Sequence, residues 1–141
     1  MPRVLKLPAF SRKASFWLSC FAIWFLTLWY LSSIAFGPQK TISVRHLDKI
    51  AHFGYFFGGA GLLAAGLHFL SRPTWPPLKH PFATPIILLL VGALDEWHQS
   101  WHPLRSGLDP LDLAADFVGA LVGTLVFRAL QPRVFPSLPV E

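Results

Sequence analysis

The chain has 141 residues, of which 53% are hydrophobic and only 13% are charged, and its mean hydropathy is +0.48. This composition is too apolar for a soluble domain of this length and predicts an integral membrane protein with a single domain. The net charge of +5 does not indicate nucleic-acid binding, because the sequence has no basic, aromatic-interleaved helix and no phosphate-binding loop. The basic residues flank apolar segments instead, as they do in membrane proteins. The single cysteine, Cys20, excludes an internal disulfide.

The first apolar segment covers about residues 16–36 and follows a basic stretch over residues 1–15. That stretch could belong to a signal peptide, with a cleavage site at Ser33-Ile34-Ala35. The apolar core is longer than signal peptides usually have, so a retained transmembrane helix is favoured. Gly37 and Pro38 then end the helix. The positive charges before it are Arg3, Lys6, Arg12 and Lys13.

Three further apolar segments follow, over about residues 48–70, 82–101 and 110–130. Each reaches the roughly 20 residues that are needed to cross a hydrocarbon core of about 30 Å. In the segment 82–101 the strictly apolar part ends at Leu94, so this segment spans a membrane only if it includes the polar residues that follow. Proline and glycine residues separate the segments. The sequence therefore predicts an all-α, four-helix transmembrane bundle with no internal repeat.

The two ends of the last segment carry their own signals. Asp109-Pro110 predicts a helix N-cap followed by a proline in the first turn, and Asp112 stands where the acid of a capping box would. After Gln131, three prolines in ten residues indicate a disordered tail over residues 131–141.

Lysine and arginine residues predict the orientation of the bundle. If the N-terminus is inside, eight of them lie on the inner side and four on the outer side. This bias predicts a multi-pass protein with a basic cytoplasmic N-terminus over residues 1–15 and a cytoplasmic tail. The inner eight are Arg3, Lys6, Arg12, Lys13, Arg72, Lys79, Arg128 and Arg133, and the outer four are Lys40, Arg45, Lys49 and Arg105.

Acidic residues gather on the predicted outer side, although acids contribute little to orientation itself. Six of the seven lie there, together with four of the six histidines. Ionisable side chains at membrane depth are costly, so such a cluster marks a candidate functional site. The acids are Asp48, Asp95, Glu96, Asp109, Asp112 and Asp116, and the histidines are His46, His52, His98 and His102.

Helical spacing places many of these residues on one face of each helix, because positions three, four or seven apart share a side. In the fourth segment the acids continue into Gly119 and Gly123, a pattern that lets transmembrane helices pack closely. Gly54, Gly58 and Gly61 predict a matching surface on the second segment. The polar faces should therefore point into the bundle. They comprise Asp48, His52 and Tyr55 on the second segment, Asp95, Gln99 and His102 on the third, and Asp112 and Asp116 on the fourth.

The rise of about 1.5 Å per residue places His52, Glu96 and Asp116 roughly 6–9 Å below the outer helix ends, in one layer. The excess of negative charge there requires compensation by Lys49, Arg105, a shared proton or a bound cation. Several polar residues also have a purely structural interpretation. Asp109 and Asp112 would be helix caps, Asp48 and Lys49 an interfacial ion pair, and His46, His98 and His102 interface residues, which leaves Asp95, Glu96, Gln99, His52 and Arg105 least explained.

One ordered set of residues carries a family resemblance. The set is Asp48-Lys49, His52, Phe53 and Tyr55, then Asp95-Glu96 and Gln99, and then Arg105, Asp109, Asp112, Gly119 and Gly123. Over about residues 46–127 this order resembles the VanZ-like family. The resemblance implies a small multi-pass protein of the bacterial inner membrane, facing the cell envelope, with no defined activity. Asp116 departs from the pattern, which more often has asparagine there, and adds a negative charge.

Three hypotheses on function remain open. In the favoured one, the polar site binds or modulates an envelope substrate, with membrane lipids or a lipid-linked precursor as partners. Arg105 and Lys49 would hold an anionic head group, and His52, Asp95 and Glu96 would position it or exchange protons. The ligand-binding candidates are Asp48, Lys49, His52, Tyr55, Asp95, Glu96, Gln99, Arg105, Asp112 and Asp116.

The second hypothesis is a metal-dependent hydrolase, in which a divalent ion activates a water molecule. No recognised motif such as HExxH supports it. The third is a small ion- or proton-coupled conduit that uses the carboxylate layer and requires oligomerisation. The catalytic candidates are Asp95, Glu96 and His52, and the metal-ligand candidates are His52, Asp95, Glu96, Asp112 and Asp116.

Overall fold

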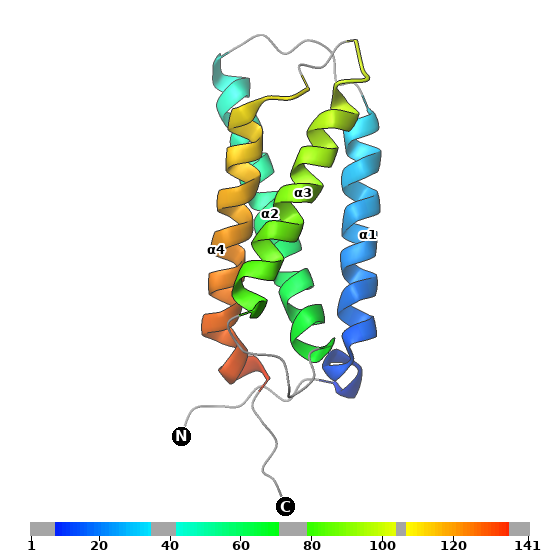
Figure 1. Ribbon diagram of the computed structural model, residues 1–141, viewed down its shortest axis with the longest axis vertical. Helices are drawn as coiled ribbons and strands as arrows, with labels where there is room; N and C mark the ends of the chain where they lie inside the picture. Colours follow the sequence, from blue (N-terminus) through cyan, green and yellow to red (C-terminus); the bar gives the residue numbers. More distant parts are fainter. Residues whose placement is uncertain (1–7, 35–41, 71–78, 104–106, 136–141) are drawn as a thin grey trace, which may run out of the picture.

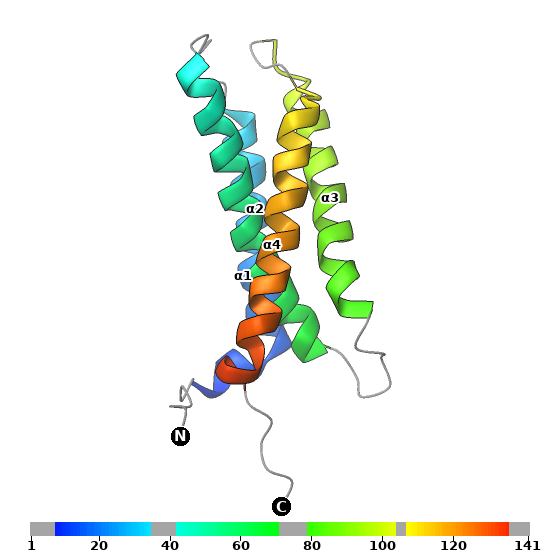
Figure 2. The same ribbon diagram turned by 90° about the vertical axis from the view of Figure 1, so that its left-hand side faces the viewer.

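The computed structural model describes residues 8–34, 42–70, 79–103 and 107–135, with the backbone alone for 42–46 and 79–81. Within this part the fold is entirely helical, and the long helices run side by side with alternating direction (Figures 1 and 2). A 3-10 helix, η1 (Ala9–Arg12), comes first. The α-helices are α1 (Ala14–Ser33), α2 (Ile42–Leu70), α3 (Lys79–Gln99) and α4 (Pro110–Val134).

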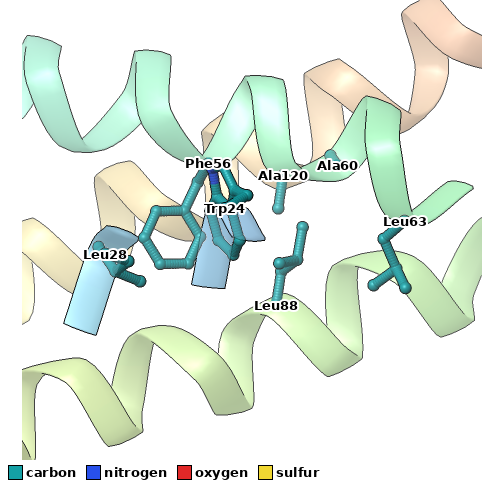
Figure 3. Packing of buried hydrophobic residues seen from close by; sticks show 7 residues of the cluster. All are labelled: Trp24, Leu28, Phe56, Ala60, Leu63, Leu88 and Ala120. Carbon is teal, nitrogen blue, oxygen red and sulfur yellow. The ribbon is translucent and has the colours of Figure 1, made fainter. Parts of the chain in front are cut away.

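Helix α2 holds the bundle together because it packs against each of the other three helices. The core between them contains aromatic and aliphatic side chains together with small alanines (Figure 3). Two reciprocal hydrogen bonds join α1 to α2: the Trp24 indole donates to the Tyr55 carbonyl at 3.2 Å, and the Tyr55 hydroxyl donates to the Trp24 carbonyl at 2.8 Å. The buried cluster is formed by Trp24, Leu28, Phe56, Ala60, Leu63, Leu88 and Ala120.

Glycines set the close approach of α4 to α2. A Cβ atom at Gly119 would collide with the carbonyl oxygen of Phe53, and one at Gly123 would lie 2.9 Å from the Cβ of Ala60. The prediction that these two glycines mediate helix packing is therefore confirmed. The prediction of a matching glycine surface on α2 is wrong, because a Cβ atom added to Gly54, Gly58 or Gly61 would meet nothing within 4 Å. Gly119 and Gly123 pack instead against the α2 backbone and Ala60.

Three of the helical segments are long and apolar enough to cross a membrane: Ala14–Ser33, Leu47–Leu70 and Pro110–Val134. Large apolar side chains such as Ile23 and Leu125 point away from the core and are 64% and 53% exposed. Such surfaces are costly in water and favourable in hydrocarbon, so the fold is that of a membrane protein. Helix α3 is not among the three segments. Its last turns carry Asp95 and Glu96, which lower its hydropathy.

Several helix bounds differ from the predicted ones. Helix α2 begins at Ile42 instead of residue 48, because the apolar pattern marks the part that can enter the membrane and not the start of the helix. Helix α4 continues to Val134, past the predicted end at residue 130, and has Pro132 inside its last turn. The predicted ranges 16–36 and 82–101 become Ala14–Ser33 and Lys79–Gln99.

The predicted disordered tail is correspondingly too long. Residues 131–134 are helical, and Phe135 is only 6% exposed. Its ring contacts the rings of Trp17 and Phe69, with centroids 6.0 and 4.9 Å apart. Burial of this aromatic side chain offsets the helix-breaking tendency of the prolines. The contact also shows that α1 begins and α4 ends at the same end of the bundle. Residues 136–141 lie outside the described residues.

Candidate functional site

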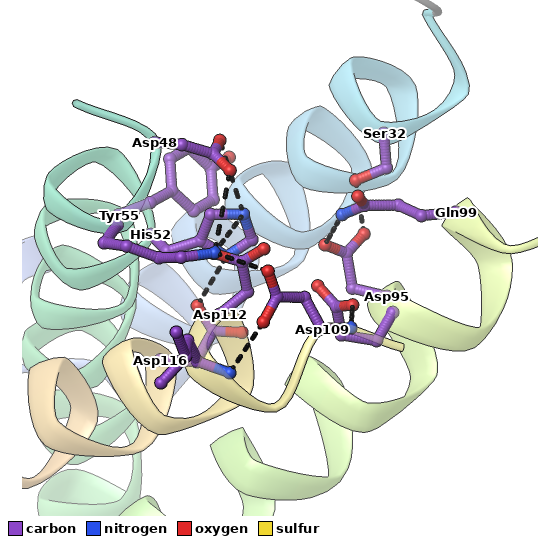
Figure 4. A network of polar contacts seen from close by, with 12 residues as sticks. Ser32, Asp48, His52, Tyr55, Asp95, Gln99, Asp109, Asp112 and Asp116 are labelled. Carbon is purple, nitrogen blue, oxygen red and sulfur yellow. Dashed lines mark hydrogen bonds and ion pairs between the residues drawn. The ribbon is translucent and has the colours of Figure 1, made fainter. Parts of the chain in front are cut away.

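A network of polar side chains occupies the opposite end of the bundle, where α1 and α3 end and α2 and α4 begin (Figure 4). Every acid in the described part of the chain belongs to this end, as the sequence predicted. Most of them are buried, with Asp95, Glu96, Asp112 and Asp116 between 0 and 6% exposed. Buried carboxylates require partners. The partners divide the network into four groups.

The first group surrounds Lys49. Its ammonium nitrogen lies 2.9 Å from Asp109 Oδ2 and forms a close ion pair with Asp112 Oδ1, so it bridges α2 to the beginning of α4. Asp48 is farther away, at 3.9 Å, and its side chain is 53% exposed. The predicted interfacial ion pair between Asp48 and Lys49 is therefore longer than the ion pairs of Lys49 with Asp109 and Asp112. Lys49 mainly neutralises the two acids of α4.

The second group pairs α2 with the next turn of α4. His52 Nδ1 lies 2.9 Å from Asp116 Oδ1, and its Nε2 lies 3.9 Å from Asp112 Oδ1 and 4.0 Å from Asp48 Oδ1. Asp116 is fully buried, and its second oxygen, Oδ2, has no hydrogen-bond partner among the described residues. A Cβ atom on Gly92 of α3 would lie 2.8 Å from this oxygen. The predicted common layer of His52, Glu96 and Asp116 is therefore confirmed for His52 and Asp116, whereas Glu96 contacts the beginning of α4.

The third group joins α3 to the end of α1. Asp95 is 2% exposed and accepts one hydrogen bond from the Ser32 hydroxyl and another, at 2.8 Å, from the Gln99 amide. Both donors are neutral. Ser32 was not among the predicted site residues. Its position in the last turn of the first apolar segment, at the same end as the acids, is the signal that would have identified it.

Glu96 points to a different neighbour from Asp95, since successive residues on a helix are about 100° apart. Its Oε2 accepts a hydrogen bond of 2.8 Å from the backbone N–H of Asp109, while Oε1 has no partner in the described part of the chain. Glu96 thus supplies a carboxylate near the N-terminus of α4, where the helix dipole favours negative charge. Leu108, with a left-handed φ of 69°, turns the chain into this contact.

This arrangement corrects the predicted capping box. Asp109 is the N-cap, as predicted, and its side chain accepts from the Leu111 N–H at 2.8 Å. The reciprocal acid is Glu96 from another helix, because Asp112 is held by Lys49. The sequence predicted that Asp95 and Glu96 would act together. The structure separates them onto the α1 and α4 sides of α3.

A pocket of about 180 Å³ lies between α1, α2 and α3. It unites five of the predicted ligand-binding residues: Asp48, His52, Tyr55, Asp95 and Gln99. Ser32 and the apolar side chains of Leu28, Leu31, Ala51 and Phe56 complete the lining. Four predicted residues, namely Lys49, Glu96, Asp112 and Asp116, belong to the adjoining network and do not line the pocket.

His98 and His102 lie in the described part of the structure, whereas the His46 side chain and Arg105 do not. His98 is 7% exposed and stacks on Trp29 with ring centroids 3.9 Å apart, so it packs between helices and does not line the pocket. His102 is half-buried after the end of α3. The His46 side chain and the whole of Arg105 lie outside the described residues.

One group of side chains has the spacing of metal ligands. Ligand atoms of Asp48, His52 and Asp112 all lie within 4.8 Å of one another. This set shares His52 and Asp112 with the predicted ligands. Asp116 is hydrogen-bonded to the other ring nitrogen of His52, and Asp95 and Glu96 bond elsewhere. The Lys49 ammonium already contacts Asp112 Oδ1. A metal ion would therefore have to compete with a positive charge of the protein itself.

No protein-family model, curated protein or solved structure matches this chain. The VanZ-like resemblance therefore stays a prediction that rests on the ordered polar residues alone.

Proposed function

We propose that this chain is a VanZ-like protein of the bacterial inner membrane that binds the polar head group of an envelope lipid or lipid-linked substrate. The observation that carries the proposal is the pocket between α1, α2 and α3, which combines five predicted polar residues with an apolar wall. A concave site with a few converging polar groups is the usual form of a small-ligand site. In this chain it lies in a bundle whose outer surface suits hydrocarbon.

The proposed topology has four crossings with both termini in the cytoplasm. Helix α3 packs against α2 and α4 and so shares their depth, although its polar last turns lower its hydropathy. Trp24 and Leu28 of α1 belong to the core, which supports a retained helix over a removed signal peptide. The eight-to-four bias in lysine and arginine supports the cytoplasmic termini. The pocket then faces the cell envelope.

Binding without turnover fits the contacts of the pocket best. The Ser32 hydroxyl and the Gln99 amide both donate to Asp95, and the Tyr55 hydroxyl donates to a backbone carbonyl. These contacts fix the shape of the lining and leave no described hydroxyl paired with His52 as a nucleophile would be. Lys49 is committed to two carboxylates, so it is a weak candidate for an anionic head group.

A metal-dependent hydrolase is the second candidate, favoured by the spacing of Asp48, His52 and Asp112. Two carboxylates and one imidazole are suitable ligands for a divalent ion, and open coordination positions would hold water. In that case Lys49 would have to release Asp112 when the ion binds.

Native mass spectrometry of the detergent-purified protein, combined with elemental analysis, tests both candidates. Ala51→Phe would fill the pocket, whereas Ala114→Phe adds the same bulk on an exposed part of α4 and serves as the control. We expect a co-purifying lipid in the wild type and in Ala114→Phe, and its loss in Ala51→Phe. Equal lipid retention by the two variants would refute the pocket as the binding site. A stoichiometric metal that is lost in His52→Ala would instead support the hydrolase.

A further inference from the structure

We infer that the head group bound in this pocket carries a positively charged amine, with its ammonium directed at Asp95. This inference rests on the proposed function and specifies its ligand. It reverses the expectation of an anionic head group, because the Lys49 ammonium is held by Asp109 and Asp112 and does not line the pocket. The observation behind it is how the network distributes its charges.

The acids outside the pocket each have at least one partner within the protein. Lys49 neutralises Asp109 and Asp112, and His52 binds Asp116. Glu96 accepts a backbone N–H at the beginning of α4, a position that favours a carboxylate. These contacts all lie on the side of the network that faces α4.

Of the two acids that line the pocket, Asp95 has no charged partner among the described residues. Asp95 is 2% exposed, and the contacts of its two oxygens are the neutral Ser32 hydroxyl and the neutral Gln99 amide. Asp48 lines the same pocket with a half-exposed side chain, 3.9 Å from the Lys49 ammonium and 4.0 Å from His52 Nε2, and both of these groups are held more closely by other acids. A buried carboxylate without a counter-charge is costly, and a cationic ligand offsets that cost.

The geometry suits an ammonium group in particular. An ionised carboxylate can accept about four hydrogen bonds, and Asp95 uses two of these sites for Ser32 and Gln99. An ammonium group has three donors, and the acceptor sites that Asp95 has left can take at least one of them. The apolar wall of Leu28, Leu31 and Phe56 suits the carbon atoms attached to such a group, which a bare metal ion lacks.

The test is a lipid titration of the full-length protein, followed by native mass spectrometry in detergent. The probes are phosphatidylethanolamine, phosphatidylcholine and phosphatidylglycerol with identical acyl chains, so only the head group differs. We expect phosphatidylethanolamine to bind about tenfold more tightly than phosphatidylglycerol, as hydrogen bonds between a charged amine and a carboxylate allow. Phosphatidylcholine should bind weakly, because its quaternary nitrogen has no N–H donors.

Two variants locate the preference. Asp95→Asn should reduce the preference for phosphatidylethanolamine over phosphatidylglycerol to less than about twofold. Ala114→Phe should keep it, because Ala114 is exposed on α4 and lies outside the pocket. If Asp95→Asn does not fold, N-acetylated phosphatidylethanolamine tests the amine itself on the wild type, since acetylation removes the charge of the amine. Weaker binding of the acetylated lipid is expected.

The outcomes separate the inference from the function on which it rests. Tight binding of phosphatidylglycerol that is lost in Ala51→Phe would refute the inference that the head group carries an amine, and it would still support the proposed lipid-binding function. No binding of any lipid would refute the proposed function. An unchanged preference in a folded Asp95→Asn variant would refute the role of Asp95. Equally tight binding of glycerophosphoethanolamine, which has no acyl chains, would support the amine and refute a lipid as its carrier.

Discussion

Replacing Lys49 by methionine removes the one described ammonium group that bridges α2 to α4 while keeping a side chain of similar length. Removing one partner of a buried ion pair costs about 3–5 kcal/mol, whereas an exposed pair contributes about 0–1 kcal/mol. The Lys49, Asp109 and Asp112 side chains are 20%, 18% and 9% exposed. The site therefore lies nearer the buried limit, and we expect the variant to lose about 2–3 kcal/mol of unfolding free energy.

Unfolding of the detergent-purified protein, followed by tryptophan fluorescence, measures this loss. Lys13→Met is the control, because Lys13 is exposed and should shift the unfolding free energy by less than about 0.5 kcal/mol. The double variant Lys49→Met/Asp112→Asn should recover part of the loss, since it also removes an unpaired carboxylate. If Lys49→Met unfolds at the same midpoint as Lys13→Met, Lys49 does not balance the acids of α4.

Gly119→Ala and Tyr55→Phe, with Gly58→Ala as a control, test the packing that positions the site, measured by the same unfolding assay. Gly119→Ala should lower the free energy of unfolding by about 1–3 kcal/mol, because the new Cβ atom meets the Phe53 carbonyl oxygen. Gly58→Ala should leave the free energy of unfolding unchanged or raise it by up to about 1 kcal/mol, because a Cβ atom there meets nothing within 4 Å. Equal effects of the two would refute the assigned α2–α4 contact. Tyr55→Phe removes the 2.8 Å hydrogen bond to the Trp24 carbonyl and should cost about 1 kcal/mol, so a variant as stable as the wild type would contradict that contact.

The helices and the polar end of the bundle were predictable because both depend on patterns along one segment. Runs of about 20 apolar residues predict helices that suit a membrane, and helical periodicity places Asp48, His52 and Tyr55 on one face. The structure contains all four predicted helices, of which three are long and apolar enough to cross a membrane, and it brings these residues together in one pocket.

The partners of individual residues were not predictable, because they depend on how each helix is rotated against its neighbours. The sequence pairs Lys49 with the adjacent Asp48, but the approach of α4 brings Asp109 and Asp112 closer. The same holds for Ser32, whose role depends on the position of α3 beside α1. Helix ends were uncertain for a further reason: Phe135 anchors the last turn of α4 through contacts that no local pattern reveals.

The separation of Asp95 from Glu96 links the fold to the proposed function. Adjacent residues on α3 face different neighbours, so one acid completes the α4 side of the network while the other lines the pocket. Stability and ligand preference should therefore respond to different substitutions. Lys49→Met should lower the unfolding free energy and leave the preference for an amine head group intact. Asp95→Asn should abolish that preference, and a loss of preference in both variants would show that the two halves of the network act as one.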